Sequence, residues 1–307
     1  MIQYSRLAAL VKHQHRHAPL YRYLPSATRG ASKGNPSTTG TVYVSQRSFI
    51  RPRHHDRPLS SALKQQNNPF HKLGRMVNNV DPNTVLWSVI GINVGVFGLW
   101  QYGISSYRQF GDPALLEFML DHFLNSPDGW EHHRWHTLLT SAFSHKNLDH
   151  LGINMLVLYS MGKGVIEAIG ASRFLLLYCG AGIAGSLGTM LYREYLRPAM
   201  VNGTSNNGRA QMQPLQTVGS LGASGSVMGL TTFFACAFPK STFLVFFVVP
   251  MPAIAVVGLF AAYDFYNATR AKASLVDSAA HIGGATYGAA YWFLRVKPLL
   301  RAGRWRV

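Results

Sequence analysis

Six mostly apolar stretches follow one another along the chain after residue 84, separated by more polar stretches. They cover residues 85–102, 148–161, 174–192, 218–238, 243–263 and 279–294. A helix that crosses a bilayer needs roughly 17–25 predominantly apolar residues. The second and sixth stretches are shorter, but a glycine-rich helix enclosed by other helices need not face lipid along its whole length. The pattern predicts an all-α polytopic membrane protein whose six spans pack as one bundle.

Residues 1–80 have a different character. Ten lysines and arginines precede residue 61 against the single acid Asp56, and Ser, Thr, Gly and Pro are frequent from residue 26 to residue 61. A segment that is rich in Arg and Ser and poor in acids is typical of a mitochondrial presequence. An ordinary disordered basic tail is the alternative. We therefore predict a presequence (transit peptide) with a disordered linker over residues 1–80, and a transmembrane domain over residues 81–307.

Composition narrows the function classes. The net charge is +17, with only 13% charged and 48% hydrophobic residues. The basic residues gather at the N-terminus and in a short C-terminal tail, which suits import and membrane-flanking charge better than a nucleic-acid interface. Cys179 and Cys236 lie in apolar stretches without a CxxC partner, so we expect neither a metal site nor a disulfide. We predict no cofactor and no nucleic-acid partner.

The loop between the first two spans contains an amphipathic segment over residues 113–124, which we expect at the membrane interface. Residues 130–136 then combine aromatic and basic side chains, as is typical of a membrane boundary. Three of these seven residues are histidines. We do not predict a metal there, because two of the histidines are adjacent, no thiolate joins them, and Glu131 is the only carboxylate in the cluster.

Polar side chains inside membrane spans are functional candidates. His150 and Asn154 are four residues apart at the start of the second span and so share one helix face. Ser224 is near the start of the fourth span and His281 near the start of the sixth. Because even-numbered spans run in the same direction, these four residues should lie at similar depth near one membrane face. A nucleophile, a base and hydrogen-bond donors would then share one layer.

Glycines surround two of these positions. Ser224 stands in Gly222-Ala223-Ser224-Gly225, and His281 shares a helix face with Gly284 and Gly288. Small residues let two helices approach closely, which would bring Ser224 to His281. A helix start also offers free N–H groups that can hold an oxyanion. The alternative interpretation of the glycines is that they only pack helices.

Taken together, these motifs resemble the rhomboid family of intramembrane serine proteases, specifically its mitochondrial members. The resemblance covers about residues 85–294. It rests on Gly222-Ala223-Ser224-Gly225, His150-x-x-x-Asn154, Ala280-His281-x-x-Gly284-x-x-x-Gly288 and Thr140-x-x-Phe143-x-His145. It implies a six-helix rhomboid bundle in which Ser224 is the nucleophile and His281 the general base, without an aspartate. His150, Asn154 and the backbone N–H of Ser224 would form the oxyanion hole. Residues expected to pack the site are Gly222, Gly225, Met228, Gly284 and Gly288.

Two positions depart from the family pattern. Many bacterial relatives carry a tyrosine four residues after the serine, packed on the histidine, where this chain has Met228. The Trp-Arg pair of the bacterial first loop corresponds to Arg134-Trp135. These departures concern the packing of the dyad and the seating of the loop rather than the chemistry.

The resemblance implies a serine endopeptidase of the mitochondrial inner membrane that cleaves transmembrane segments of single-span proteins. Family members suggest a dynamin-like fusion GTPase and cytochrome c peroxidase as fungal substrates, or a mitophagy kinase in animals. A first alternative is a rhomboid-like protein that binds membrane clients without cutting them, but such relatives lack the serine or the histidine. A second is a transporter or proton channel that uses His150 and His281, which predicts a repeat of spans that the sequence does not show.

Charge also predicts an orientation. Basic termini on one side, with Lys163, Arg173 and Lys240 in the loops that follow even-numbered spans, favour both ends in the matrix. The site would then open to the intermembrane space. Mitochondrial members typically have a further span before the core; we find no apolar candidate before Val85, and such a span would invert the geometry.

Overall fold

A computed structural model describes residues 69–145, 147–196, 219–245, 249–269 and 278–302. Most of residues 1–80, predicted as presequence and linker, lie outside this part of the chain. The long helices are α3 (Pro82–Phe110), α7 (Leu148–Ile169), α8 (Ala171–Leu191), α10 (Ser224–Ala237), α11 (Ala253–Thr269) and α12 (Ser278–Tyr291). Shorter elements are α2 (Pro69–Asn78), α4 (Ala114–Phe123), α5 (Pro127–Glu131), α6 (Thr137–Thr140), η2 (Ser141–Phe143), η3 (Tyr192–Leu196), β1 (Thr242–Val245), β2 (Val249–Pro252), η4 (Trp292–Val296) and α13 (Lys297–Arg301).

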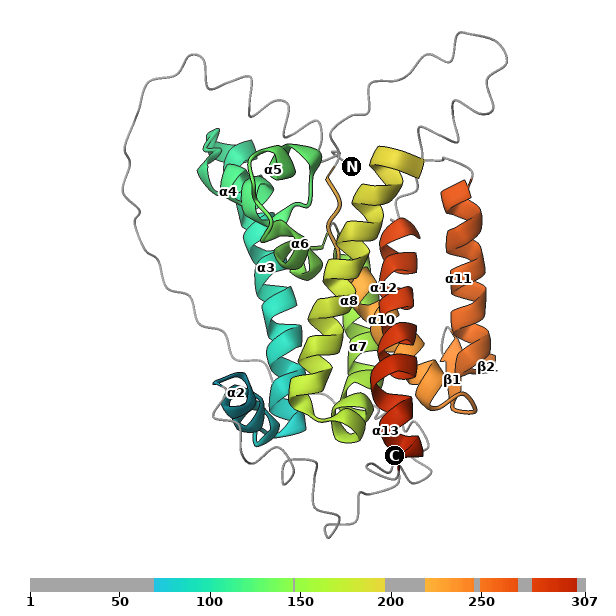
Figure 1. Ribbon diagram of the computed structural model, residues 1–307. Helices are drawn as coiled ribbons and strands as arrows, with labels where there is room; N and C mark the ends of the chain where they lie inside the picture. Colours follow the sequence, from blue (N-terminus) through green and yellow to red (C-terminus); the bar gives the residue numbers. More distant parts are fainter. Residues whose placement is uncertain (1–68, 146, 197–218, 246–248, 270–277, 303–307) are drawn as a thin grey trace, which may run out of the picture.

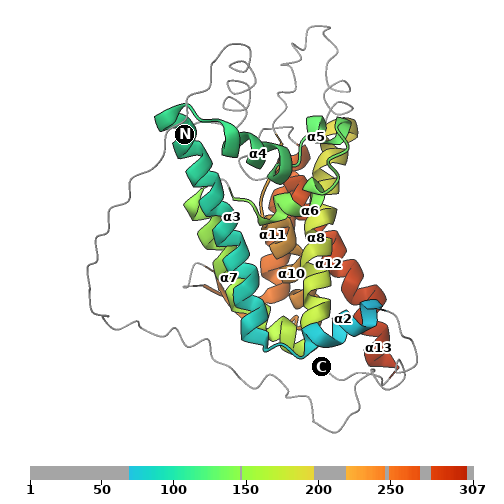
Figure 2. The same cartoon turned by 90° about the vertical axis from the view of Figure 1, so that its left-hand side faces the viewer.

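The all-α fold class is confirmed, with one long helix at each predicted span. Figure 1 shows α8, α10 and α12 side by side, with α3 on one flank and α11 on the other, and Figure 2 shows α7 beside α3. Among the described helices, Pro82–Phe110 and Ala171–Leu196 are long and apolar enough to cross a membrane, judged by length and composition alone. Ser224–Ala237 is a shorter apolar helix. The count of six membrane crossings stays a prediction.

Two predicted span boundaries are wrong. The stretch that begins at residue 243 does not start as a helix, because Thr242–Val245 and Val249–Pro252 form an antiparallel hairpin and α11 begins only at Ala253. Pro250 and Pro252 lack an N–H and have a fixed φ, so the second strand is a better place for them than a helix interior. The fourth helix begins at Ser224 rather than at residue 218, since the chain just before it is not helical.

The prediction of disorder up to residue 80 is wrong at its end. Pro69–Asn78 forms helix α2, which lies across one end of the bundle beside α8 (Figures 1 and 2). The amphipathic segment over residues 113–124 contains helix α4 at the opposite end of the bundle, and its place at the membrane interface stays a prediction. Both helices have only ten residues, and each has one face that packs on the rest of the protein, which is what stabilises a short helix.

A hydrophobic core joins the central helices. Leu158, Phe174, Leu177, Leu230 and Phe233 are fully buried and come from α7, α8 and α10. A second cluster fixes the connecting segment over α3, where Trp100, Leu116 and Met119 are likewise fully buried. The indole Nε1–H of Trp100 also donates to the Ser144 hydroxyl at 3.0 Å. The loop before α7 is therefore held to the bundle by both apolar burial and a buried hydrogen bond.

Glycines let α8, α10 and α12 touch backbone to backbone. A Cβ added to Gly284 would lie 2.0 Å from the Gly225 carbonyl oxygen, and one added to Gly288 would lie 2.0 Å from that of Gly229. Neither position therefore accepts a larger side chain without separating the helices. The close approach of the fourth and sixth helices, which we predicted from Gly284 and Gly288, is confirmed.

Candidate active site

Ser224 is the first residue of α10, after an extended segment that other parts of the chain hold in place. The backbones of Ser220 and Asn125 form an isolated antiparallel bridge through two hydrogen bonds of 2.7 and 3.0 Å. The N–H of Gly222 donates to the carbonyl of Ser141 at 3.0 Å. Both partners lie in the segment between α3 and α7. The position of Ser224 thus depends on a loop that is far away in the sequence.

Gly222 separates Ser224 from His150. Its φ is 151°, a conformation that side-chain-bearing residues rarely adopt. A Cβ at this position would lie 3.0 Å from the His150 Cε1 and 3.5 Å from the Ser224 Oγ. The imidazole of His150 and the hydroxyl of Ser224 therefore approach the same side of Gly222. This proximity explains why the position two residues before the serine needs a glycine.

His281 lies in the first turn of α12 and is half-buried. Helices α10 and α12 run in parallel, and Gly225 lies next to both Ala280 and Gly284, so His281 is in the turn of α12 that contacts Gly225. The Ala280 carbonyl oxygen would lie 3.3 Å from a Cβ on Gly225. Ser224 and His281 are thus on touching helices, at the same end of their contact. Their similar depth near one membrane face stays a prediction.

His150 and Asn154 occupy the first two turns of α7, as their spacing predicts. The Asn154 side chain is buried, and its amide donates to the His150 carbonyl at 3.0 Å. A primary amide has two N–H donors, so this bond leaves one donor for another acceptor. The hydrogen bond fixes the Asn154 side chain against its own helix.

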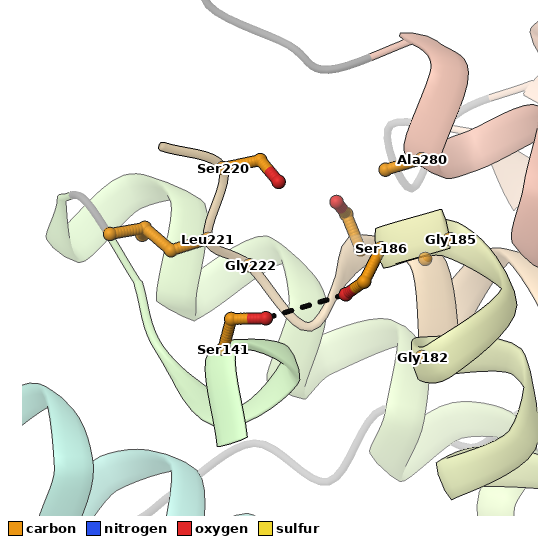
Figure 3. Close-up of a pocket in the computed structure, with 10 residues that line it drawn as sticks. Ser141, Gly182, Gly185, Ser186, Ser220, Leu221, Gly222 and Ala280 are labelled. Carbon is orange, nitrogen blue, oxygen red and sulfur yellow. Dashed lines mark hydrogen bonds between the residues drawn. The ribbon is translucent and has the colours of Figure 1, made fainter. Parts of the chain in front are cut away.

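A polar cavity adjoins Ser224 and was not predicted (Figure 3). Its lining combines serine hydroxyls with glycine backbone: Ser141, Gly182, Gly185, Ser186, Ser220, Leu221, Gly222, Ser224, Gly225 and Ala280. The hydroxyls of Ser141 and Ser186 are 3.3 Å apart and are joined in Figure 3 by a dashed line. Asn125 donates to the Ser186 carbonyl at 3.1 Å. A cavity lined by hydroxyls and carbonyls can hold water beside Ser224.

His145 was noticed only as part of the family motif, and the structure gives it a specific environment. The side chain is fully buried and meets the His150 ring edge-on, with 5.4 Å between centroids. Burial, followed by the neighbouring His150, lowers the pKa of His145 to about 3. The Phe143 backbone acts in the opposite direction, although it makes no hydrogen bond of normal geometry with the ring. His145 is therefore a neutral imidazole that backs His150.

The segment that carries Arg134-Trp135 is seated by polar contacts. The Arg134 guanidinium lies 2.6 Å from the Asp121 carboxylate on α4. The Trp130 indole donates to the Asn125 side chain at 3.1 Å and its ring meets that of Trp135. The same Asn125 holds the strand before Ser224. The reversed Trp-Arg order is thus compatible with a loop that is fixed to the site.

The family model described as Rhomboid domain matches residues 132–298. This range includes every residue of the candidate site described above except Asp121, Asn125 and Trp130. The chain belongs to the rhomboid family. Among its curated relatives are Rhomboid protein 1, mitochondrial, of Saccharomyces cerevisiae (34% identity over 73% of this chain) and RHOMBOID-like protein 12, mitochondrial, of Arabidopsis thaliana (32% over 74%). Presenilin-associated rhomboid-like protein, mitochondrial, of Homo sapiens is 26% identical over 76%.

The aligned part corresponds to 59%, 61% and 54% of the length of those three relatives. This rhomboid thus spans little more than half of each relative. That its relatives are mitochondrial proteins agrees with the location predicted from the basic N-terminal region. The range matched by the family model includes α7, α8, α10, α11 and α12, so family membership supports the fold of these helices.

Proposed function

We propose that this rhomboid is a serine endopeptidase that cleaves transmembrane segments within the bilayer. The observation that carries the proposal is the contact of α10 with α12 at Gly225 and Gly284. Ser224, which lines the polar cavity, and His281 are on these two touching helices, each close to the contact. A serine hydroxyl is a weak nucleophile at neutral pH and needs an adjacent base.

In the proposed mechanism the Ser224 Oγ attacks the scissile carbonyl while His281 accepts its proton. The negative charge that develops on the carbonyl oxygen is held by the Ser224 backbone N–H, at the start of a helix, with the Asn154 amide and the His150 ring. His281 then returns the proton to the leaving amine. Water from the cavity lined by Ser141, Ser186 and Ser220 attacks the acyl-enzyme, with His281 again as base, and releases Ser224.

The substrates of this activity are single-span membrane proteins. A helical peptide bond is shielded by its own hydrogen bonds, so cleavage requires local unwinding and favours segments with small or helix-weakening residues. We place the enzyme in the mitochondrial inner membrane as a multi-pass protein. A dynamin-like GTPase and cytochrome c peroxidase are the substrate candidates to test first.

Ser224→Ala tests the proposal in purified protein reconstituted with a single-span reporter. We expect cleavage to fall at least about 10³-fold, because the nucleophile is removed, and a fluorophosphonate probe to stop labelling the protein. Ser160→Ala is the matched control, since its exposed hydroxyl only bonds the Leu156 carbonyl one turn earlier. Cleavage by Ser224→Ala at the control's rate would refute the assignment.

A client-binding role without cleavage is the competing candidate. Under that reading, neither Ser224 nor His281 would react with the probe, and the wild-type protein would retain its reporter uncut.

Asn154→Ala adds a graded test of the protease proposal. We expect a fall in the cleavage rate, because loss of one oxyanion donor lowers a rate by about 10–10³-fold. An unchanged rate would remove Asn154 from the oxyanion hole while leaving the dyad in place.

A further inference from the structure

Helix α2 presents three different stripes around its axis. At roughly 100° per residue, Gly74, Val77 and Asn78 point to one side, and this side faces the bundle: Gly74 lies near Ser172, and Val77 packs on the core. The next stripe holds Leu73 and Met76, which are 58% and 61% exposed. The third stripe is basic.

The basic stripe consists of Lys72 and Arg75, both exposed. It borders the stripe of Leu73 and Met76 on the side away from the bundle. A protein-facing side, an exposed apolar stripe and a basic stripe in succession are what a helix needs to lie at a membrane interface. Such a helix keeps its apolar residues among the acyl chains and its cations at the headgroups.

Asn78 fixes this helix to the bundle. Its side-chain oxygen accepts a hydrogen bond from the Ser172 N–H at 2.8 Å, in the first turn of α8. Gly170, which precedes α8, has no side chain with which to cap the helix. Asn78 therefore supplies the missing cap from another element. The three stripes of α2 cannot rotate relative to α8 while this bond persists.

The position of α2 along the bundle matches a headgroup layer. Helix α3 starts at Pro82, four residues after α2 ends, and its buried apolar face starts at Val85. Figures 1 and 2 show α2 lying across the end of the bundle, at the level where α3 begins. The exposed apolar stripe of α2 therefore lies where a span enters the membrane.

Charge at this end of the bundle is mostly positive. Described basic residues at this end, on α2 or near the ends of the long helices, are Lys72, Arg75, Lys163, Arg173, Lys240, Arg295, Lys297 and Arg301, against Asp81 and Glu167. Anionic lipid attracts basic residues that lie close to the membrane surface. This charge favours an anionic lipid over a second copy of the chain, which would bring like charges together.

We propose that α2 is an in-plane anchor that binds anionic phospholipid headgroups through Lys72 and Arg75, while Leu73 and Met76 insert among the acyl chains. The proposal goes beyond proteolysis and does not depend on it. It assigns a lipid-binding surface to the end of the molecule opposite the candidate active site, and it links that surface to α8 through Asn78.

Thermal unfolding of the purified full chain in dodecyl maltoside micelles tests this surface. The micelles contain increasing mole fractions of phosphatidylglycerol or phosphatidylcholine. We expect phosphatidylglycerol to raise Tm more than phosphatidylcholine does. In Lys72→Gln/Arg75→Gln, the phosphatidylglycerol fraction that gives half of this rise should increase about 10- to 30-fold. Arg108→Gln/Arg193→Gln, with the same charge change at the opposite end of α3 and α8, should respond like the wild type.

An equal response of both double variants would overturn the proposal, as would an equal rise produced by inorganic phosphate alone, which would indicate a free-phosphate site. Equal Tm values of all variants in phosphatidylcholine establish that they fold. A nitroxide on Leu73→Cys, with Cys179→Ala and Cys236→Ala, gives a second readout in vesicles of both lipids. We expect it to be accessible to oxygen and protected from a water-soluble nickel reagent. Accessibility to nickel, or burial from both reagents as by a second protein, would also overturn it.

Discussion

At the scale of single residues, His145 and Gly222 determine the surroundings of the His150 ring. Gly222 lets the His150 ring come close to the Ser224 hydroxyl, since any Cβ there would crowd Cε1 at 3.0 Å. His145 supports the same ring from another direction and is itself fully buried. Because the pKa of His145 falls to about 3, it brings no positive charge next to His150 at physiological pH. His145 is thus a neutral neighbour of the proposed oxyanion hole.

His145→Gln should flatten the acid dependence of stability. The His145 pKa is about 3 in the folded protein against an ordinary 6.5, so between these pH values the unfolded state binds one more proton. Stability therefore falls as pH drops from 6.5 toward 3, by up to roughly 2 kcal/mol at pH 5 from this group. Glutamine keeps a polar side chain but does not titrate. Thermal unfolding in detergent between pH 7 and pH 5 measures the slope.

His133→Asn is the control for that series, because His133 is exposed in the loop and already has a positive φ that asparagine tolerates. Its slope should match the wild type. An undiminished slope in His145→Gln would mean that the acid sensitivity arises elsewhere in the chain.

Residues of the candidate site differed in how far they could be predicted. Ser224, His281, His150 and Asn154 could be found because each is polar in an otherwise apolar stretch. Ser141, Ser186 and Ser220 could not, since serines are common in loops and in glycine-rich helices. Only the packing of α8 against the segment before α10 makes them neighbours. The clue was the short spacing of Gly182, Gly185 and Ser186, which a search for close helix contacts could have used.

At the scale of elements, the contact of α10 with α12 decides the distance between the two halves of the proposed dyad. Gly225 and Gly284 touch through their backbones, and Gly229 and Gly288 repeat the contact one turn later. The repeat at a spacing of four residues was visible in the sequence, so the pairing was predictable. The boundaries of the helices were less predictable from the sequence. The start of α11 depended on two prolines inside an apolar stretch, and hydrophobicity alone does not distinguish a buried strand from a helix.

Gly284→Ala should separate α10 from α12. Its Cβ would lie 2.0 Å from the Gly225 carbonyl oxygen, so the backbones must move apart. We expect a loss of about 1–3 kcal/mol in the free energy of unfolding. The rate of reporter cleavage should fall more than about tenfold, because a displacement of 1 Å at a reacting group can cost 10²-fold.

Gly98→Ala is the matched control, in α3, where an added Cβ meets no atom within 4 Å. There the better helix propensity of alanine should leave stability unchanged or raise it by roughly 0.5–1 kcal/mol. Full activity and stability in Gly284→Ala would show that the helices tolerate a wider separation and that proximity of Ser224 to His281 does not rest on this glycine.

At the scale of the whole molecule, the described charges divide between the two ends of the bundle. The end with α4, α5 and the candidate site carries most of the acids, which are Asp112, Glu117, Asp121, Asp128, Glu131, Asp149 and Glu194. The described basic residues there are Arg108, Arg134 and Arg193. At the end with α2 and α13, the described basic residues outnumber the described acids. Basic residues near span ends favour the matrix side of the membrane, so the site should open to the intermembrane space.

Cysteine accessibility in mitochondria tests this orientation. In a chain with Cys179→Ala and Cys236→Ala, Glu131→Cys should react with a membrane-impermeant maleimide as soon as the outer membrane is ruptured. Ala302→Cys, at the other end of the bundle, should react only after the inner membrane is permeabilised. Both positions are exposed, so a difference in labelling reports the side of the membrane rather than burial. The reverse pattern would mean that an additional span precedes α3 and inverts the bundle. The anionic-lipid surface of α2 would then face the intermembrane leaflet, and the proposed protease would cut its substrates from the matrix side.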